Sequence, residues 1–323
     1  MIGYIGKRLG AAVFVLFAIS VLVFLIFFAT PGVDPAARIA GKNADPATLA
    51  QVRASFGLDD PLPVQYGMMM KHLFITHDLT SFVNRGTLVM PQIIDAIPVT
   101  LSLVVGAAVI WMVLGIVMGT LAGWLKGTIV DPLVMLVGVF GVSLPVYWLG
   151  EVVNLLTQKQ LHDSVFSWVP PLGYVPFSQS PGQWALHLLF PWLTLALLYA
   201  GIYARLLRGE LINALNEDYV RTARAKGLSE RRILIKHALR CSLIPIVSLF
   251  GLDFGALVGG AALLTEVVFG LPGVGKLTYQ ALQNLDLPVI MGTVLYAAFF
   301  VVLANAVVDV LYARLDPRVR HAA

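Results

Sequence analysis

The chain has 323 residues, a net charge of +4, 58% hydrophobic residues and only 12% charged residues. Soluble domains usually carry roughly 45–50% apolar and about 25% charged residues. This composition therefore excludes an ordinary soluble domain and indicates an integral membrane protein.

Six hydrophobic runs reach the length of about 20 residues that an α-helix needs to cross the hydrocarbon core of a bilayer. We therefore expect a single all-α transmembrane domain over residues 1–323 with six spans. These spans cover residues 9–30, 98–125, 132–157, 184–204, 241–265 and 287–308. The first run is longer than the apolar part of a signal peptide, about 7–15 residues, and lacks a small-x-small cleavage site, so we interpret it as an uncleaved anchor.

The lysines and arginines predict the orientation of these spans. With the N-terminus in the cytoplasm, 15 of the 22 basic residues fall in cytoplasmic segments, which leaves seven outside. Short cytoplasmic loops are enriched in Lys and Arg, so we expect a multi-pass membrane protein with both termini in the cytoplasm. The net positive charge follows from this topology and requires no nucleic-acid partner.

The longest predicted extracytoplasmic segment covers residues 31–97, about 67 residues. Asp45 and Pro46 precede ATLAQVRASF and Gly57, a pattern typical of a capped surface helix with proline in its first position. LDDPLPVQY then predicts a turn that leads into a second amphipathic stretch. The segment is either a contact site for an external partner or a structural cap over the helix bundle.

Two spans carry small residues four positions apart, which allow close approach of helix backbones. These residues are Gly115, Gly119 and Gly123 in the second span and Gly251, Gly255 and Gly259 in the fifth. We interpret both faces as packing surfaces in preference to pore linings.

Ionisable residues at membrane depth are costly and are therefore functional candidates. Asp253 has twelve uncharged residues on each side, and Glu151 lies in the outer part of the third span with Asn154 three residues later. Asp253 is a candidate for a water-lined pathway or a charge-paired interface. Glu151 is a weaker candidate for the same roles.

One motif resembles a phosphate-binding loop and fails on inspection. Gly270–Lys276 reads GLPGVGK, but Leu277 follows where the motif requires Ser or Thr. The stretch also follows a membrane span instead of a buried strand, and the predicted topology places it outside, away from ATP. We find no catalytic residues, no metal-ligand cluster and no nucleotide site, so the chain is not expected to be an enzyme.

Residues 205–240 form a basic cytoplasmic loop with the signals of a short helix. Asn216 is suited to cap its start and Gly227 to end it, and Ser229 is positioned to cap a second helix. The second helix carries Arg231, Arg232, Lys236 and Arg240. Such a helical pair indicates a platform for a partner; the alternative is a solvated loop whose charges only fix the topology.

The segment EDYVRTARAKGLSERRILIKHALRCSLIP resembles the cytoplasmic loop of permease subunits of ATP-binding-cassette importers, in the dipeptide and oligopeptide branch. YIGKRLGAAVFVLFAISVLVF, LDDPLPVQY, EVVFGLPGVGKL and LYARLDPRVR resemble the same branch, so the resemblance covers nearly the whole chain. The wider importer family carries an EAA-x3-G motif, of which only Ala223 and Gly227 match here. The acidic pair Glu217-Asp218 lies earlier than that motif's glutamate.

The resemblance implies a peptide permease that works by alternating access, with a coupling helix that docks on a cytoplasmic ATPase. Exposed Tyr219, Val220 and Ala223 are expected to pack against it, and basic residues to complement its charge. The implied coupling residues are Glu217, Asp218, Tyr219, Val220, Arg221, Ala223, Arg224, Lys226 and Gly227. The implied partners are a second homologous permease, two ATPase subunits, an extracytoplasmic solute-binding protein and the lipid membrane. ATP and magnesium are expected on the ATPases, and no cofactor on this chain.

Other functions remain open at this stage. An ion-coupled carrier or channel subunit would also have several spans, although it would favour more intramembrane charges or an inverted repeat. A membrane-embedded enzyme would need a reactive constellation. Permeases of this branch also carry nickel chelates, glutathione or haem, and no residue distinguishes these cargoes from peptides.

Overall fold

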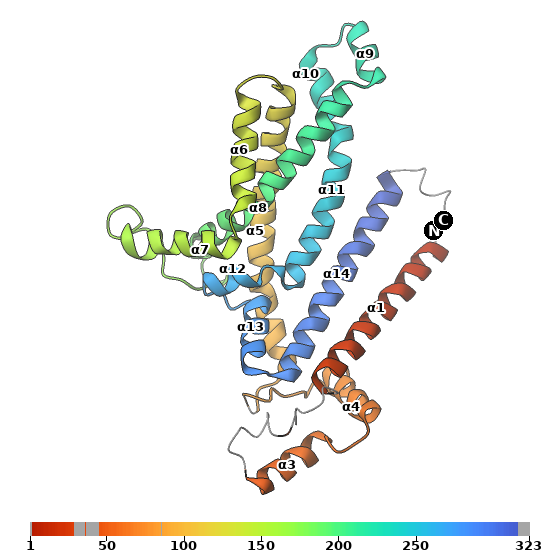
Figure 1. Ribbon diagram of the computed structural model, residues 1–323, viewed down its shortest axis with the longest axis vertical. Coiled ribbons are helices and arrows are strands. Elements are labelled where there is room, and N and C mark those ends of the chain that lie inside the picture. Colours follow the sequence, from red (N-terminus) through yellow and green to blue (C-terminus); the bar gives the residue numbers. More distant parts are fainter. Residues whose placement is uncertain (1, 29–35, 37–44, 85, 316–323) are drawn as a thin grey trace.

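The computed structural model describes residues 2–28, 36, 45–84 and 86–315. These residues are almost entirely helical, and their one isolated β-bridge joins Thr80 to Leu88. The expected all-α class is confirmed. The loop with α9 (Asp218–Ala225) and α10 (Glu230–Arg232) lies at one end of the molecule, and α3 (Pro46–Phe56) and α4 (Leu62–Phe74) lie at the other (Figure 1).

Several helices are long and apolar enough to cross a membrane. Within the described residues four qualify, at 89–124, 181–215, 230–261 and 287–308, and a bent pair at 130–160 is a fifth if it counts as one span. The first helix, α1 (Ile2–Phe28), contributes a shorter apolar stretch, Gly10–Ile26. A multi-pass membrane protein is therefore supported, while the count of six spans stays a prediction.

The centre of the molecule is the packing of α5 (Val89–Trp124) against α8 (Pro181–Leu215). A Cβ atom added at Gly119 would lie 2.7 Å from the carbonyl oxygen of Ala204, so only glycine allows this approach. The second glycine face meets α14 (Leu287–Leu315), where Gly255 lies against Ala304. Both faces are packing surfaces, as predicted.

The third predicted span, 132–157, is not one straight helix. It divides into α6 (Val130–Ser143) and α7 (Val146–Leu155), which meet at 93° and are visible in Figure 1 as two perpendicular rods. Leu144, before Pro145, adopts an extended conformation (φ −97°, ψ 129°), because proline disfavours helical geometry in the residue that precedes it. α7 continues into the π-helical turn η1 (Leu156–Gln160).

The second cytoplasmic helix predicted after Ser229 is not a separate element. α10, the π-helical segment η2 (Ile233–Ala238), α11 (Leu239–Ala256) and η3 (Leu257–Ala261) form one continuous helical run. Arg231, Arg232, Lys236 and Arg240 therefore lie on the first turns of a membrane helix. The run ends near Gly260 (φ 113°), after which α12 (Leu263–Val268) and α13 (Val274–Asn284) follow.

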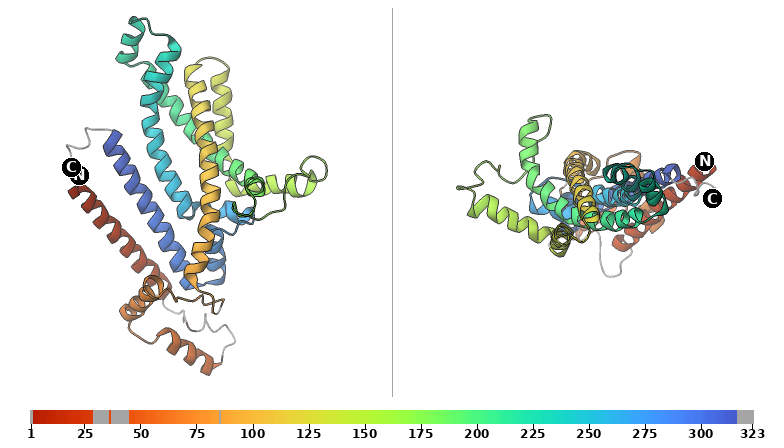
Figure 2. Two further views of the ribbon diagram at one scale, coloured as in Figure 1. Left: turned by 180° about the vertical axis from the view of Figure 1, so that it is seen from behind. Right: turned by 90° about the horizontal axis from the view of Figure 1, so that it is seen from above.

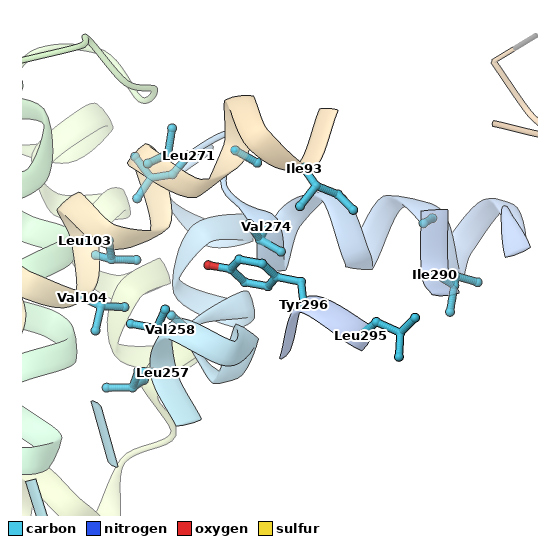
Figure 3. Packing of buried hydrophobic residues seen from close by; sticks show 14 of the residues in the cluster. Ile93, Leu103, Val104, Leu257, Val258, Leu271, Val274, Ile290, Leu295 and Tyr296 are labelled. Atoms are coloured by element: carbon cyan, nitrogen blue, oxygen red, sulfur yellow. The ribbon is translucent and has the colours of Figure 1, made fainter. Parts of the chain in front are cut away.

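The hydrophobic core joins these later elements to α5. Figure 3 shows Leu103 and Val104 of α5 close to Leu257 and Val258, with Tyr296 of α14 pointing into the same cluster. The view from behind in Figure 2 shows α5 running the length of the bundle beside these elements. Residues of α12 and α13 are thereby held against the central helix.

The predicted extracytoplasmic segment forms an ordered cap wherever the structure describes it. α3 begins at Pro46 and α4 follows Pro61, and both helices agree with the sequence prediction. Tyr66 of α4 packs edge-on against Phe24 of α1, with ring centroids 5.4 Å apart. The far end of the segment is held against the bundle by a hydrogen bond of 3.0 Å, which the backbone N–H of Phe82 donates to the side chain of Asp286.

Candidate functional site

The helix α9 is an eight-residue element with a defined stop. The N–H of Gly227 donates to the carbonyl of Arg224 (2.9 Å), and that of Leu228 donates to Ala223 (3.2 Å). These two bonds make a Schellman motif, in which the left-handed residue is Gly227 (φ 74°). The predicted stop is confirmed.

The predicted start of this helix is wrong. Asn216 ends α8 instead, and its side-chain amide donates back to the carbonyl of Ile212 (3.0 Å). Glu217 takes the position before the first turn, and its side chain makes no capping hydrogen bond. Ser229 takes the same position before α10 and also makes no side-chain cap.

One face of α9 is buried against its own chain. Val220 is fully buried, Ala223 is 7% exposed, and both pack against Ile233 of η2. The expectation that Val220 and Ala223 are exposed for a partner is therefore wrong. The outward face consists of polar residues and Tyr219, which is 40% exposed.

Ion pairs also hold α9 in place. The guanidinium of Arg224 makes two hydrogen bonds to the carboxylate of Glu230, at 2.8 and 3.2 Å. Asp218 pairs with Arg221 one turn later, at 3.2 Å. These pairs are exposed, so each contributes little to stability. Arg224 thus joins α9 to α10, while Glu217 and Lys226 remain exposed on the outward face.

The base of α9 is connected to two membrane helices. Leu234 and Ala238 of η2 form a small buried cluster with Leu211 and Ala214 at the end of α8. The segment that holds Val220 is therefore packed against the end of α8 and is continuous with α11. α9 is therefore attached, through η2, to both helices.

A second candidate site lies where α5, α8 and α11 meet. The hydroxyl of Tyr203 donates a hydrogen bond of 2.8 Å to Asp253. Tyr203 is 1% exposed and lies beside Trp111, with ring centroids 6.2 Å apart. Gly115 allows the close approach of Tyr203, because a Cβ there would lie 2.7 Å from the Cβ of Tyr203.

The same cluster is lined by aromatic rings. Tyr199 stacks on Trp111 at 4.8 Å, and Phe250 lies 5.8 Å from Trp111. Phe254 follows Phe250 by one turn, with ring centroids 5.6 Å apart. We name the group of Trp111, Tyr199, Tyr203, Phe250, Asp253 and Phe254 the Asp253 cluster.

Glu151 lies away from this cluster. It is exposed on α7, the helix that is perpendicular to α6. Asn154, three residues later, is buried, and its amide donates to the carbonyl of Val268 in α12 (2.9 Å). Among the described residues, no hydrogen bond or ion pair joins Glu151 to Asp253.

Glu266, a fully buried carboxylate on α12, is a site residue that was not predicted from the sequence. The hydroxyl of Thr100 donates to it at 2.6 Å, and the backbone N–H of Lys276 donates at 2.9 Å. The N–H of Val274 in turn donates to the hydroxyl of Thr100 (2.9 Å). Burial raises the pKa of Glu266 to about 7.

Glu266 also explains the loop that resembles a phosphate-binding motif. The backbone of residues 273–276 surrounds this carboxylate, and a side chain at Gly273 would collide with it. The amino group of Lys276 donates to the carbonyl of Gly270 (3.1 Å). The loop thus surrounds a carboxyl group of its own chain. An acidic residue four positions before Gly270, the first glycine of the loop, was the available signal.

Comparisons with known proteins agree with this architecture. Residues 112–321 match the family model "Binding-protein-dependent transport system inner membrane component", and residues 1–104 match its N-terminal counterpart. A relative in Brucella abortus (strain 2308), named for a peptide transport system permease, is 39% identical over 99% of this chain and 100% of its own length.

Two further relatives have named substrates. The glutathione transport system permease protein GsiC of Salmonella typhimurium (strain LT2) is 38% identical, over 99% of this chain and 100% of its own length. The dipeptide transport system permease protein DppB of Alkalihalophilus pseudofirmus is 32% identical over the same shares of the two chains. The chain therefore belongs to the family of inner membrane components of binding-protein-dependent transport systems.

Proposed function

We propose that this chain is a peptide-importing permease subunit that forms half of a translocation pathway. A second, homologous permease forms the other half, and two cytoplasmic ATPase subunits drive the cycle. Relatives named for peptide, dipeptide and glutathione transport support this substrate class. Glutathione is the second candidate cargo because a relative named for it is 38% identical over nearly the whole chain.

The observation that carries this proposal is the attachment of α9. This helix projects at the end of the molecule (Figure 1), yet it is packed on Ile233 and linked to α10 by Arg224. A helix satisfies its backbone hydrogen bonds internally and therefore moves as a rigid unit. ATP-driven closure of the ATPases would move α9, and with it the ends of α8 and α11.

The docking surface in this proposal is the outward face of α9. Tyr219 provides an exposed aromatic ring of the kind that dominates binding energy at interfaces. The charged residues around Tyr219 would pair with residues of opposite charge at the edge of the partner's surface. They are Glu217, Asp218, Arg221 and Lys226.

The remaining partners are assigned to the two ends of the molecule. ATP and magnesium are held by the ATPase subunits, since the glycine-rich loop of this chain surrounds Glu266. The solute-binding protein docks on the end that carries α3 and α4, and both chain termini are cytoplasmic. Glu151, exposed on α7, is assigned to an interface and Asp253 to the pathway.

The test is the complete importer, reconstituted in proteoliposomes with its binding protein. Gly227→Ala forces an alanine into the left-handed region, which costs about 1–2 kcal/mol, and is expected to reduce both ATPase co-purification and ATP-driven dipeptide uptake. Gly209→Ala is the matched control, because Gly209 lies in α8 with open space around it. Unchanged uptake after deletion of residues 218–225 would falsify the coupling role.

A further inference from the structure

We infer that the Asp253 cluster binds the α-ammonium group of the peptide as it passes through the permease. This inference rests on the proposed function and names the chemical group that the pathway recognises. Its starting point is a half-buried carboxylate at the middle of a membrane helix. Such groups are costly unless a partner compensates their charge.

The described side chains around Asp253 do not supply that compensation. Tyr203 is a neutral donor to one carboxylate oxygen of Asp253. Among the residues whose side chains the structure describes, no Lys, Arg or His forms an ion pair with Asp253. Tyr203 therefore orients the carboxylate and leaves its negative charge available to a cation.

The surroundings of Asp253 suit an organic cation. Phe250, Asp253 and Phe254 occupy positions i, i+3 and i+4 of one helical face, and all three are half-buried. Tyr199 of α8 is half-buried as well and adds a further aromatic ring. Aromatic faces attract ammonium groups because the face of the ring carries the negative part of its quadrupole. Rings on two helices beside one carboxylate thus favour an alkylammonium over a hydrated metal ion.

The base of the site is buried. Trp111 and Tyr203 are essentially fully buried, and the Tyr203 hydroxyl donates to Asp253. The half-exposed side of Asp253 cannot face lipid without a large penalty, so it faces the pathway or the second permease. Every linear peptide with a free N-terminus carries the same ammonium group, with a pKa of about 7.7–8.0. A site for this group explains how one pathway serves peptides of different sequence.

Uptake alone would not isolate this site, because the external binding protein also selects the cargo. The more direct readout is modification of Asp253 by a hydrophobic carbodiimide in the reconstituted importer, mapped by mass spectrometry. The probes are alanyl-phenylalanine amide and its N-acetyl counterpart, which differ only at the ammonium group. At about ten times its half-protecting concentration, the free-amine probe should slow the labelling about tenfold.

The N-acetyl probe should give no protection, and Asp253→Asn should remove the label while the importer still assembles. Equal protection by both probes, or protection by neither, would overturn the inference. An Asp253 that does not react with the carbodiimide would also overturn the inference. The carboxylate would then be covered by a basic residue of the second permease or by bound hydrogen-bond donors, and would not be open to the peptide. ATP-driven uptake by the unmodified importer tests the proposed function separately, so failure of one does not imply failure of the other.

Discussion

Asp253 and Glu266 lie on neighbouring segments, yet they have opposite environments. Glu266 is fully buried and accepts hydrogen bonds from Thr100 and from the backbone of Lys276. Asp253 is half-buried and accepts one hydrogen bond, from Tyr203. Both carboxylates are costly to bury, but only that of Glu266 is enclosed by its own chain. The difference separates a structural carboxylate from one that is open to a ligand.

The largest expected effect on stability comes from Glu266→Ala. The change leaves Thr100 and the Lys276 N–H without their acceptor in a buried site, which costs about 3 kcal/mol. Thermal unfolding of the purified protein in detergent measures the loss. The matched variant Glu266→Gln keeps the shape and one acceptor and should lose less. Equal unfolding midpoints for Glu266→Ala and the unmodified protein would show that Glu266 is not a structural carboxylate. The contrast with Asp253 would then be lost.

The pH dependence of unfolding should report Glu266 as well. Its folded-state pKa is about 7, against an ordinary value of 4.5, so the folded protein binds more protons than the unfolded protein between these values. Stability from this group is therefore fully present below pH 4.5 and is lost as the pH rises through about 7. Unfolding midpoints measured across this range should fall, and Glu266→Gln should flatten the curve. An equally steep curve in that variant would assign the effect to another group.

Asp253→Asn should change stability by about 1 kcal/mol or less, because it removes one hydrogen-bonded charge from a half-open site. The same thermal unfolding assay checks this. A loss as large as that of Glu266→Ala would mean that Asp253 is also a structural group.

A small effect, close to that of Asp253→Asn, is expected for Tyr203→Phe. This change removes one hydroxyl and its hydrogen bond but keeps the ring against Trp111, at a cost of about 0.5–1.5 kcal/mol or less. Carbodiimide labelling of Asp253 should continue in this variant, with weaker protection by the free-amine probe. Protection that is fully retained would show that Tyr203 does not orient the carboxylate.

The sequence predicted the parts of this fold that depend on local chemistry. Gly227 was identified as a helix stop because a left-handed residue favours glycine, and the glycine faces of α5 and α11 follow from close packing. Asn216 was misassigned because nothing local shows that α8 extends to Leu215. The polar character of residues 229–240 likewise hid the continuity of α10 with α11.

The candidate sites show the same division. Asp253 is evident from hydropathy alone, since uncharged residues surround it. Glu266 is not, because its donors come from Thr100 on α5 and from a loop that folds back over it. The burial of Val220 and Ala223 was also missed, because it depends on Ile233 across a turn. Contacts between elements distant in sequence decide these cases.

ATP-driven uptake of a labelled dipeptide by the importer with Asp253→Asn, assayed with the same binding protein as the unmodified importer, tests the central claim over a complete transport cycle. The assembled complex should keep its thermal midpoint and its ATPase subunits but lose uptake about tenfold or more, which corresponds to about 1.4 kcal/mol of lost interaction with the passing ammonium. Asp253→Glu, which keeps the charge, should restore part of the activity. Uptake at the unmodified rate in Asp253→Asn would contradict the claim that this carboxylate contacts the peptide.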